Sequence, residues 1–229
     1  LFVLNRETGE PIFRVEERPV PARDVPDESA WPTQPFTAVT PPLVPHRIAE
    51  ADLWGATPEE LTACRDAFRA ARNEGAFTPP SYRGSLVIPS NIGGAHWGGV
   101  AADAARGIAV VPVNNLAAIV QLIPLDGYNR ASYNSESPRY DWQFTTMNGT
   151  PYVMRRGFAL SPAGVPCSPP PWGALVAVDL STGLIKWQSA LGCVPVPAGG
   201  SPPAVPLGSP QLGGPIVTAS GLVFIGATL

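Results

Sequence analysis

One short hairpin pattern occurs twice in this chain, and the repeat constrains the fold more than any other feature. The later copy, Ala177–Trp187, reads AVDLSTGLIKW. A hydrophobic run leads into Asp179, a turn closes at Thr182-Gly183, and a second strand ends on the tryptophan. Glycine suits a turn position of positive φ, and aspartate and threonine side chains can cap such a turn. The opening residues, LFVLNRETGEPIF, repeat the pattern, with asparagine for aspartate and phenylalanine near the place of tryptophan.

Two copies of one hairpin indicate a repeated β unit, and a propeller blade is the best-known unit of this kind. At roughly 40 to 50 residues per blade, the 229 residues make only about four or five blades. The 23 glycines and 29 prolines favour short strands joined by ordered loops over long helices. We therefore expect an all-β fold in one domain, residues 1–229, with no linker between two cores.

The chain opens on Leu1 in mid-strand and closes within another strand-like segment, which indicates a piece of a longer protein. An incomplete ring of blades would leave two open strand edges. We therefore expect the isolated piece to be inactive and to aggregate or unfold readily. A sharp, reversible thermal transition of a monomer would contradict this expectation.

Composition argues against several classes of function. The 15 basic and 18 acidic residues give a net charge of −3, so nothing favours nucleic acid or an anionic membrane surface. No apolar stretch approaches the roughly 18 residues of a membrane-spanning helix, and the first residues lack a signal-peptide pattern. A Walker motif, a G-x-S-x-G elbow and a post-strand G-x-G-x-x-G are all missing from the sequence, so the matching hydrolases and Rossmann dehydrogenases are not indicated.

One helix is expected, between Ala51 and Glu74. Thr57 can cap its first turn, Pro58 suits its first position, and apolar residues then recur at helical spacing until Gly75 ends it. Strands are expected at residues 84–89, 97–103, 107–113, 116–123, 175–187 (as a hairpin), 214–218 and 221–226.

Four segments are expected to be irregular. Val15–Pro45 is rich in proline, and Asp126–Gly149 is polar and lacks periodicity. Ser161–Trp172 and Val194–Pro210 are again rich in proline.

The segment Asn91–Gly99 is the strongest candidate for a binding site. Its four glycines surround His96-Trp97, which places bare backbone beside a flat indole and would let a planar ligand stack there. The alternative is that the glycines serve a bend and that Trp97 is part of the core. His96 is one of only two histidines, and the sequence holds no His/Cys/Asp cluster with metal-ligand spacing.

Two further pairs are ambiguous from sequence. The adjacent amides Asn114-Asn115 follow a strand and would either coordinate a hard cation through their oxygens or hold a turn. Gly213-Gly214 precede Pro215 in a tight bend of the kind that often approaches a propeller axis.

The three cysteines, Cys64, Cys167 and Cys193, cannot all pair within the chain. An oxidising compartment would allow a Cys64–Cys167 bridge, which the sequence cannot establish. The alternative for Cys64 is a small, buried apolar residue on the helix.

Many segments in order along nearly the whole chain resemble one enzyme family, the pyrroloquinoline quinone (PQQ)-dependent dehydrogenases of the membrane-bound glucose/quinate/shikimate branch. The matching segments are residues 1–9, 16–21, 32–36, 52–57, 74–81, 91–99, 122–124, 149–152, 166–167, 171–173, 179–187 and 212–216. The resemblance implies part of an eight-bladed β-propeller of the quinoprotein type, with PQQ near its axis above Ca²⁺ or Mg²⁺. The repeated hairpin corresponds to the docking hairpin of the family's blades.

The resemblance also implies roles for individual residues. Binding of the cofactor would fall to Trp97, His96, Gly94, Asn115, Gly213 and Gly214, and binding of the metal to Asn114. The family's catalytic acid and quinone-contacting lysine would lie upstream of Leu1, and a further pocket aspartate would follow Leu229, so no catalytic residue is expected in this stretch. A vicinal cysteine pair, typical of the methanol-oxidising branch, is missing from the sequence, which favours the glucose/quinate branch.

The activity implied by the resemblance is oxidation of a sugar, a cyclic polyol or another alcohol. A carboxylate would take the hydroxyl proton while hydride passes to PQQ, with the metal as Lewis acid. Electrons would pass to ubiquinone through a membrane part of the parent protein, which implies the periplasmic face of the bacterial inner membrane. The alternatives are a non-catalytic propeller scaffold of the outer-membrane assembly type, which would have no use for His96-Trp97, and a secreted sugar-binding β domain.

Overall fold

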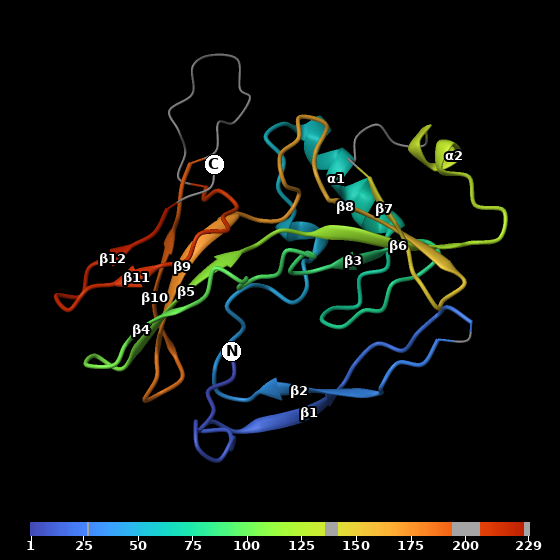
Figure 1. Ribbon diagram of the computed structural model, residues 1–229. Helices are drawn as coiled ribbons and strands as arrows, with labels where there is room; N and C mark the ends of the chain where they lie inside the picture. Colours follow the sequence, from blue (N-terminus) through green and yellow to red (C-terminus); the bar gives the residue numbers. More distant parts are fainter. Residues whose placement is uncertain (27, 136–141, 194–206, 227–229) are drawn as a thin grey trace.

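The computed structural model describes residues 1–26, 28–135, 142–193 and 207–226 (Figure 1). Across these residues the strands form four separate antiparallel sheets, two of four strands and two of two strands. The expected all-β, partial-propeller fold is confirmed. That residues 1–229 form one domain stays a prediction.

One four-stranded sheet is built like a propeller blade. Its strands are β4 (Ala101–Asp103), β5 (Ile108–Asn114), β9 (Gly173–Asp179) and β10 (Ile185–Ala190). They lie side by side in chain order, which is the meander of a blade. Buried valines of β5 and β9 form a core on one of its faces, together with Val44.

The other four-stranded sheet departs from chain order. Its strands are β3 (Ser85–Val87), β6 (Ala118–Pro124), β7 (Gln143–Thr146) and β8 (Tyr152–Phe158), and they lie in the order β3-β6-β8-β7. Because β6, β7 and β8 fall between β5 and β9 in sequence, they form an insertion within the blade. Helix α1 (Pro58–Ala70) lies against this sheet (Figure 1). Its Cys64 and Phe68 share a core with Leu86 and Ile119.

The remaining sheets are β1 (Val15–Pro19) with β2 (Thr33–Thr37), and β11 (Ile216–Val217) with β12 (Val223–Phe224). Strand β11 lies beside β4 of the blade. Two of the four described sheets thus have the four strands of a full blade. The described part of the chain holds fewer full blades than its length indicated, because the insertion and the Pro-rich connections take up much of that length.

Two segments expected to be irregular contain regular structure. Val15–Pro45 forms β1 and β2, and Asp126–Gly149 contains α2 (Arg130–Ser135) and β7. Strand β8 was also not foreseen. The strands among them are stabilised by pairing with another strand, β1 with β2 and β7 with β8. In the β1-β2 pair each strand contains a proline and has only one neighbour, so the proline costs it few hydrogen bonds.

Helix α1 begins as predicted and ends early. The hydroxyl of Thr57 accepts a hydrogen bond from the backbone N–H of Glu60 at 3.3 Å, and Pro58 opens the helix. The helix ends at Ala70 rather than near Gly75. The reason is that the backbone N–H of Arg72 donates to the carbonyl of Gly84 at 2.8 Å, which draws the chain onto the edge of the sheet. Residues Glu50–Asp52 form a separate 3-10 turn, η1.

The two hairpin turns match in atomic detail. Oδ1 of Asn5 accepts from the N–H groups two and three residues later at 2.8 and 3.2 Å, and Oδ1 of Asp179 does the same at 2.9 and 3.2 Å. Gly9 and Gly183 both have a φ of +76°. Hydrogen bonds donated by the hydroxyl and the backbone N–H of Ser181 hold the pKa of the Asp179 carboxyl below its ordinary value.

The first hairpin also touches the second. The ring of Phe13, near the tryptophan position of the first copy, lies against Gly183 in the turn of the second. A Cβ atom added to Gly183 would lie 3.0 Å from Cε2 of Phe13 and 3.1 Å from Oγ1 of Thr40. The glycine is therefore needed for close packing between neighbouring hairpins as well as for its φ angle.

Candidate functional site

The loop between β3 and β4 presents a tryptophan to solvent. Trp97 is 77% exposed, and its ring centroid lies 6.1 Å from that of His96 at an interplanar angle of 68°. A core side chain would be covered, so Trp97 is not part of the core of the described residues. Its role in stacking on a ligand stays a prediction. Its indole face is open to a flat ligand.

His96 presents a hydrogen-bond donor that has no partner. Its Nδ1 accepts from the backbone N–H of Gly98 at 2.9 Å. Burial lowers the pKa of the imidazole, so the ring is neutral at pH 7 and its single proton lies on Nε2. Nε2 is buried without a hydrogen-bond partner. A buried, unsatisfied N–H is costly unless an acceptor binds to it, which makes this nitrogen a natural contact for a carbonyl or carboxylate oxygen.

Asn114, at the end of β5, fastens two loops together. Its backbone N–H donates to the carbonyl of Gly94 at 2.9 Å. Its side-chain Nδ2 donates to the carbonyl of Gln211 at 2.8 Å, and Oδ1 accepts from the N–H of the same residue at 2.9 Å. The Asn114 side chain is fully buried. This geometry fits the alternative in which the amide holds the chain, and a metal-binding role for Asn114 stays a prediction.

Glycines let the same two loops approach each other closely. A Cβ atom on Gly214 would overlap the carbonyl oxygen of Gly98, and one on Gly98 would lie 2.9 Å from the carbonyl oxygen of Gly213. Gly94 is similarly enclosed by Val44 and Pro89. The two Gly-Gly segments therefore meet backbone to backbone, and larger residues would separate them.

The structure thus brings most of the predicted site residues to one end of the blade. Gly94, His96, Trp97, Asn114, Gly213 and Gly214 are linked there by the contacts described above. Asn115 points elsewhere, since its Nδ2 donates to the carbonyl of Pro169 at 2.7 Å. Sequence reasoning missed Gln211, whose backbone makes both bonds to Asn114. The only signal was its place directly before the Leu212-Gly-Gly match.

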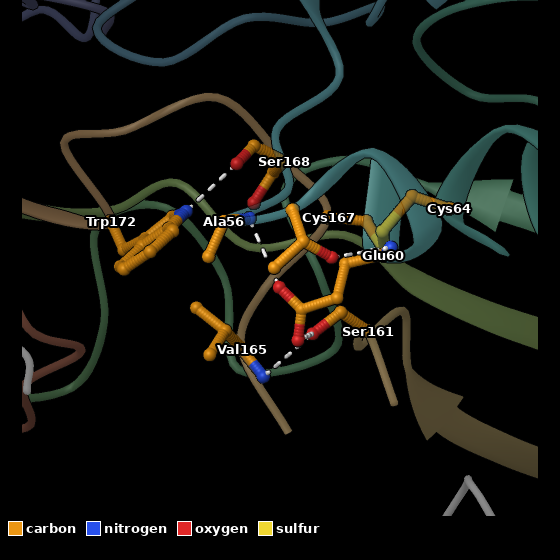
Figure 2. The surroundings of a disulfide bond; sticks show 9 residues. Ala56, Glu60, Cys64, Ser161, Val165, Cys167, Ser168 and Trp172 are labelled. Atoms are coloured by element: carbon orange, nitrogen blue, oxygen red, sulfur yellow. Dashed lines mark hydrogen bonds between the residues drawn. A yellow bond between two sulfur atoms is a disulfide. The ribbon is translucent and has the colours of Figure 1, made fainter. Parts of the chain in front are cut away.

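A disulfide supports this end of the blade from the side of the insertion. Cys64 of α1 is bonded to Cys167, with Cα atoms 5.5 Å apart, so the bridge that the sequence left open is present (Figure 2). Ser168 donates through its hydroxyl to the carbonyl of Asn115 at 2.7 Å, and its own carbonyl accepts from Nε1 of Trp172 at 2.8 Å. The disulfide thus joins α1 to Cys167, and the next residue, Ser168, is hydrogen-bonded to Asn115, which directly follows β5.

Beside the disulfide, a buried carboxylate adds a second connection. Oε2 of Glu60 accepts from the backbone N–H of Ala56 at 3.0 Å, and Oε1 accepts from the hydroxyl of Ser161 at 3.3 Å (Figure 2). Cys193, the third cysteine, is exposed and unpaired.

The fold and the loop geometry agree with one known family. The family model described as PQQ glucose/ethanol/alcohol dehydrogenase, β-propeller domain, matches residues 1–229. The chain belongs to this family. A propeller is built from repeated four-stranded blades, which accounts for the four-stranded sheet β4-β5-β9-β10 and for the two copies of the hairpin.

Three relatives illustrate the range of the PQQ-dehydrogenase family. The chain is 37% identical over 233 residues to a "Probable quinate dehydrogenase (quinone)" from Xanthomonas campestris pv. juglandis, covering 100% of this chain and 29% of the relative. It is 37% identical over 235 residues to "Quinoprotein glucose dehydrogenase A" from Acinetobacter calcoaceticus, covering 99% and 29%. It is 35% identical over 247 residues to a "Glycerol dehydrogenase large subunit" from Gluconobacter thailandicus, covering 99% and 32%. The chain therefore spans less than a third of the length of these relatives.

The loop residues fit a PQQ group in two respects. The open indole of Trp97 offers a stacking surface for a flat ring system, and the buried Nε2–H of His96 offers a donor for one of its oxygens. No cluster of three or more His, Cys, Asp or Glu suited to a metal ion occurs among the residues that the structure describes.

In the same described residues, neither helix has the length and apolar character needed to cross a bilayer.

Proposed function

We propose that the full-length protein is a PQQ-dependent dehydrogenase that oxidises a sugar, a cyclic polyol or another alcohol. The observation that supports this most strongly is the pairing of an exposed Trp97 with the buried, unpartnered Nε2–H of His96 at the end of a blade. The names of the relatives, which include quinate, glucose and glycerol dehydrogenases, support the same class of substrate.

Each loop residue would have a physical task. Trp97 would stack on the cofactor ring, and His96 would donate a hydrogen bond to one of its oxygens. Gly94, Gly213 and Gly214 would hold the loops in the close packing that presents Trp97 and His96 to the cofactor. When bound, PQQ supplies the two-electron acceptor for alcohol oxidation.

The proposed Ca²⁺ or Mg²⁺ would need hard oxygen ligands. Oδ1 of Asn114 already accepts one hydrogen bond from Gln211, so it could serve a metal only through its second lone pair. Asn115 is proposed to contact the cofactor; its Nδ2 is turned toward Pro169, so the atom left for a ligand is its buried Oδ1, which has no hydrogen-bond partner.

Ubiquinone is the proposed electron acceptor, and the periplasmic face of the bacterial inner membrane the proposed location. The "(quinone)" in the name of a relative supports the first. The buried Cys64–Cys167 disulfide supports the second, because disulfides persist in oxidising compartments.

Replacing Trp97 with alanine in the full-length protein tests the proposal. We expect PQQ affinity, measured by calorimetric titration, to fall by at least about tenfold, because a stacked aromatic is worth on the order of 1 kcal/mol or more beyond its buried area. Trp31→Ala is the matched control, since Trp31 is 74% exposed and lies outside the site. The control is expected to bind PQQ as tightly as wild type.

A dye-linked oxidation assay with glucose, quinate, shikimate and glycerol would then identify the substrate and, with Ca²⁺ or Mg²⁺ added, the metal. Equal PQQ affinity in Trp97→Ala and wild type would contradict the assigned stacking role. A folded wild-type protein that neither binds PQQ nor oxidises these alcohols would favour the scaffold alternative.

A further inference from the structure

A small pocket lies where the insertion meets the candidate cofactor loop. Its volume is about 250 Å³, and it is lined by Asn91 and Ile92, which begin the Asn91–Gly99 loop, and by residues of β7, β8 and the turn after β8. Sites for drug-sized molecules measure roughly 300 to 1,000 Å³, so this pocket suits a single small ring. A ligand here would border a cofactor held by the same loop.

Strand pairing places Arg156 on the face of the insertion sheet opposite α1. Ile119 of β6 packs in the core with α1 and pairs with Gly157 of β8. Side chains alternate along a strand, so the next pair, Val120 with Arg156, points to the other face. Gln143 of β7 pairs with Arg156 in the register, and both line the pocket.

The amide of Gln143 orients the guanidinium of Arg156. Its Oε1 accepts a hydrogen bond from Nε of Arg156 at 3.0 Å. The two Nη groups, with four N–H donors between them, are left for a ligand. Among the described residues no carboxylate lines the pocket. The flat pair of Nη groups matches the two oxygens of a carboxylate, which binds such a fork through two parallel hydrogen bonds.

The rest of the lining fits a hydroxylated ring. Ile92, Phe158 and Leu160 are apolar and half-buried, and they suit the carbon face of a small ring. Asn91 lies at the loop side, and its amide can both donate to and accept from a hydroxyl group. A ring with a carboxylate at one end and hydroxyl groups toward the loop therefore matches the pocket. A neutral sugar would leave the charge of Arg156 without a partner.

We infer that Arg156 is a specificity-determining residue that binds a carboxylate of the substrate, and this rests on the proposed function. The substrate is then a cyclic hydroxy acid rather than a neutral sugar. Its carboxylate binds to the Nη groups of Arg156, and its ring lies on the apolar lining with the hydroxyl groups toward the loop of His96 and Trp97. PQQ carries carboxylates as well, so the test separates the two sources of this group.

Calorimetric titration of the full-length protein with quinate and with methyl quinate tests the inference, because the methyl ester differs in lacking the negative charge. The protein is loaded with reduced PQQ, so that the ligand is not oxidised. We expect wild type to bind quinate at least about tenfold more tightly than the ester, because hydrogen bonds to a charged group are the stronger ones. Arg156→Gln is expected to lose this preference. Arg156→Lys should keep part of it, because lysine retains the charge without the fork.

The matched control is Arg155→Gln. It removes the same charge one residue away, from the opposite face of β8, where the guanidinium of Arg155 lies 4.6 Å from the ring centroid of Trp142. This variant is expected to keep the wild-type preference for quinate. Loss of the preference in Arg155→Gln as well would mean that overall charge decides it, and would overturn the role of Arg156.

Protein prepared without cofactor is titrated with PQQ and with both quinate ligands, so that the two proposals fail separately. Wild type that binds no PQQ, but prefers quinate in a way that Arg156→Gln abolishes, would overturn the proposed function and leave a carboxylate site standing. A tenfold loss of PQQ affinity in Arg156→Gln would show that the cofactor supplies the carboxylate, and would overturn the assignment to the substrate. Wild type that binds PQQ but does not prefer quinate to its ester would overturn this inference alone, as would a preference that persists in Arg156→Gln.

Discussion

Replacing Gly183 with alanine is expected to destabilise the protein by about 2 to 4 kcal/mol, while the same change at Gly9 costs about 1 kcal/mol. Both glycines have a φ of +76°, so both variants carry the same backbone penalty. They differ in their neighbours. A Cβ atom on Gly183 meets Phe13 and Thr40 at 3.0 and 3.1 Å, whereas one on Gly9 meets nothing within 4 Å.

The difference between the two variants therefore isolates the contact between neighbouring hairpins. It is measured as the shift in thermal unfolding of the full-length protein, with Gly183→Ala melting several degrees below Gly9→Ala at about 2 to 4 °C per kcal/mol. Equal melting temperatures would show that the glycine serves only the turn. Phe13→Ala is expected to reproduce part of the loss, because it removes the ring that lies against Gly183.

Loss of the Cys64–Cys167 disulfide is expected to have the largest effect on stability. The bridge closes a loop with a sequence separation of 103 residues, for which chain entropy alone predicts about 4 to 5 kcal/mol. The double variant Cys64→Ser with Cys167→Ser also places two hydroxyls at positions that are 0% exposed. We expect a fall in melting temperature on the order of 10 °C or more.

The control is Cys193→Ser, which removes the exposed, unpaired cysteine and is expected to melt with wild type. Reducing agent should lower the melting temperature of wild type and of Cys193→Ser, and leave the double variant unchanged. Identical melting of reduced and oxidised wild type would mean that the bridge does not hold α1 to the insertion.

The parts of the fold that the sequence predicted depend on local interactions. The turns at Asn5 and Asp179 and the start of α1 at Thr57 are stabilised by side chains within a few residues of the groups they bind. Strands β1, β2 and β7 were missed because proline and polar residues mask their periodicity, so that only the pairing in the folded chain reveals them. The end of α1 was misplaced for the same reason, since its terminating bond comes from Gly84.

The candidate site likewise has one part that could be predicted from adjacent residues and another that could not. The glycine-flanked His96-Trp97 stands out in the sequence because the unusual residues are adjacent. The meeting of that loop with Gly213-Gly214 does not, because it depends on two bonds between Asn114 and Gln211, which are 97 residues apart in sequence. Whether an asparagine oxygen faces a cation or a backbone amide is decided by such partners, and residue type alone leaves both open.

The insertion between β5 and β9 leaves the blade and returns to it at adjacent points. Asn114 pairs with Gly173 in the sheet, and the N–H of Asn115 donates to the carbonyl of Trp172 at 2.9 Å. The chain thus leaves the blade and rejoins it at the tip of a single hairpin. Evolution can vary such a module without moving a strand of the blade, provided that the pairing of β6 with β3 and the Cys64–Cys167 bridge are kept. Enzymes with one common redox centre could thereby acquire different specificities by exchanging the module at this hairpin tip.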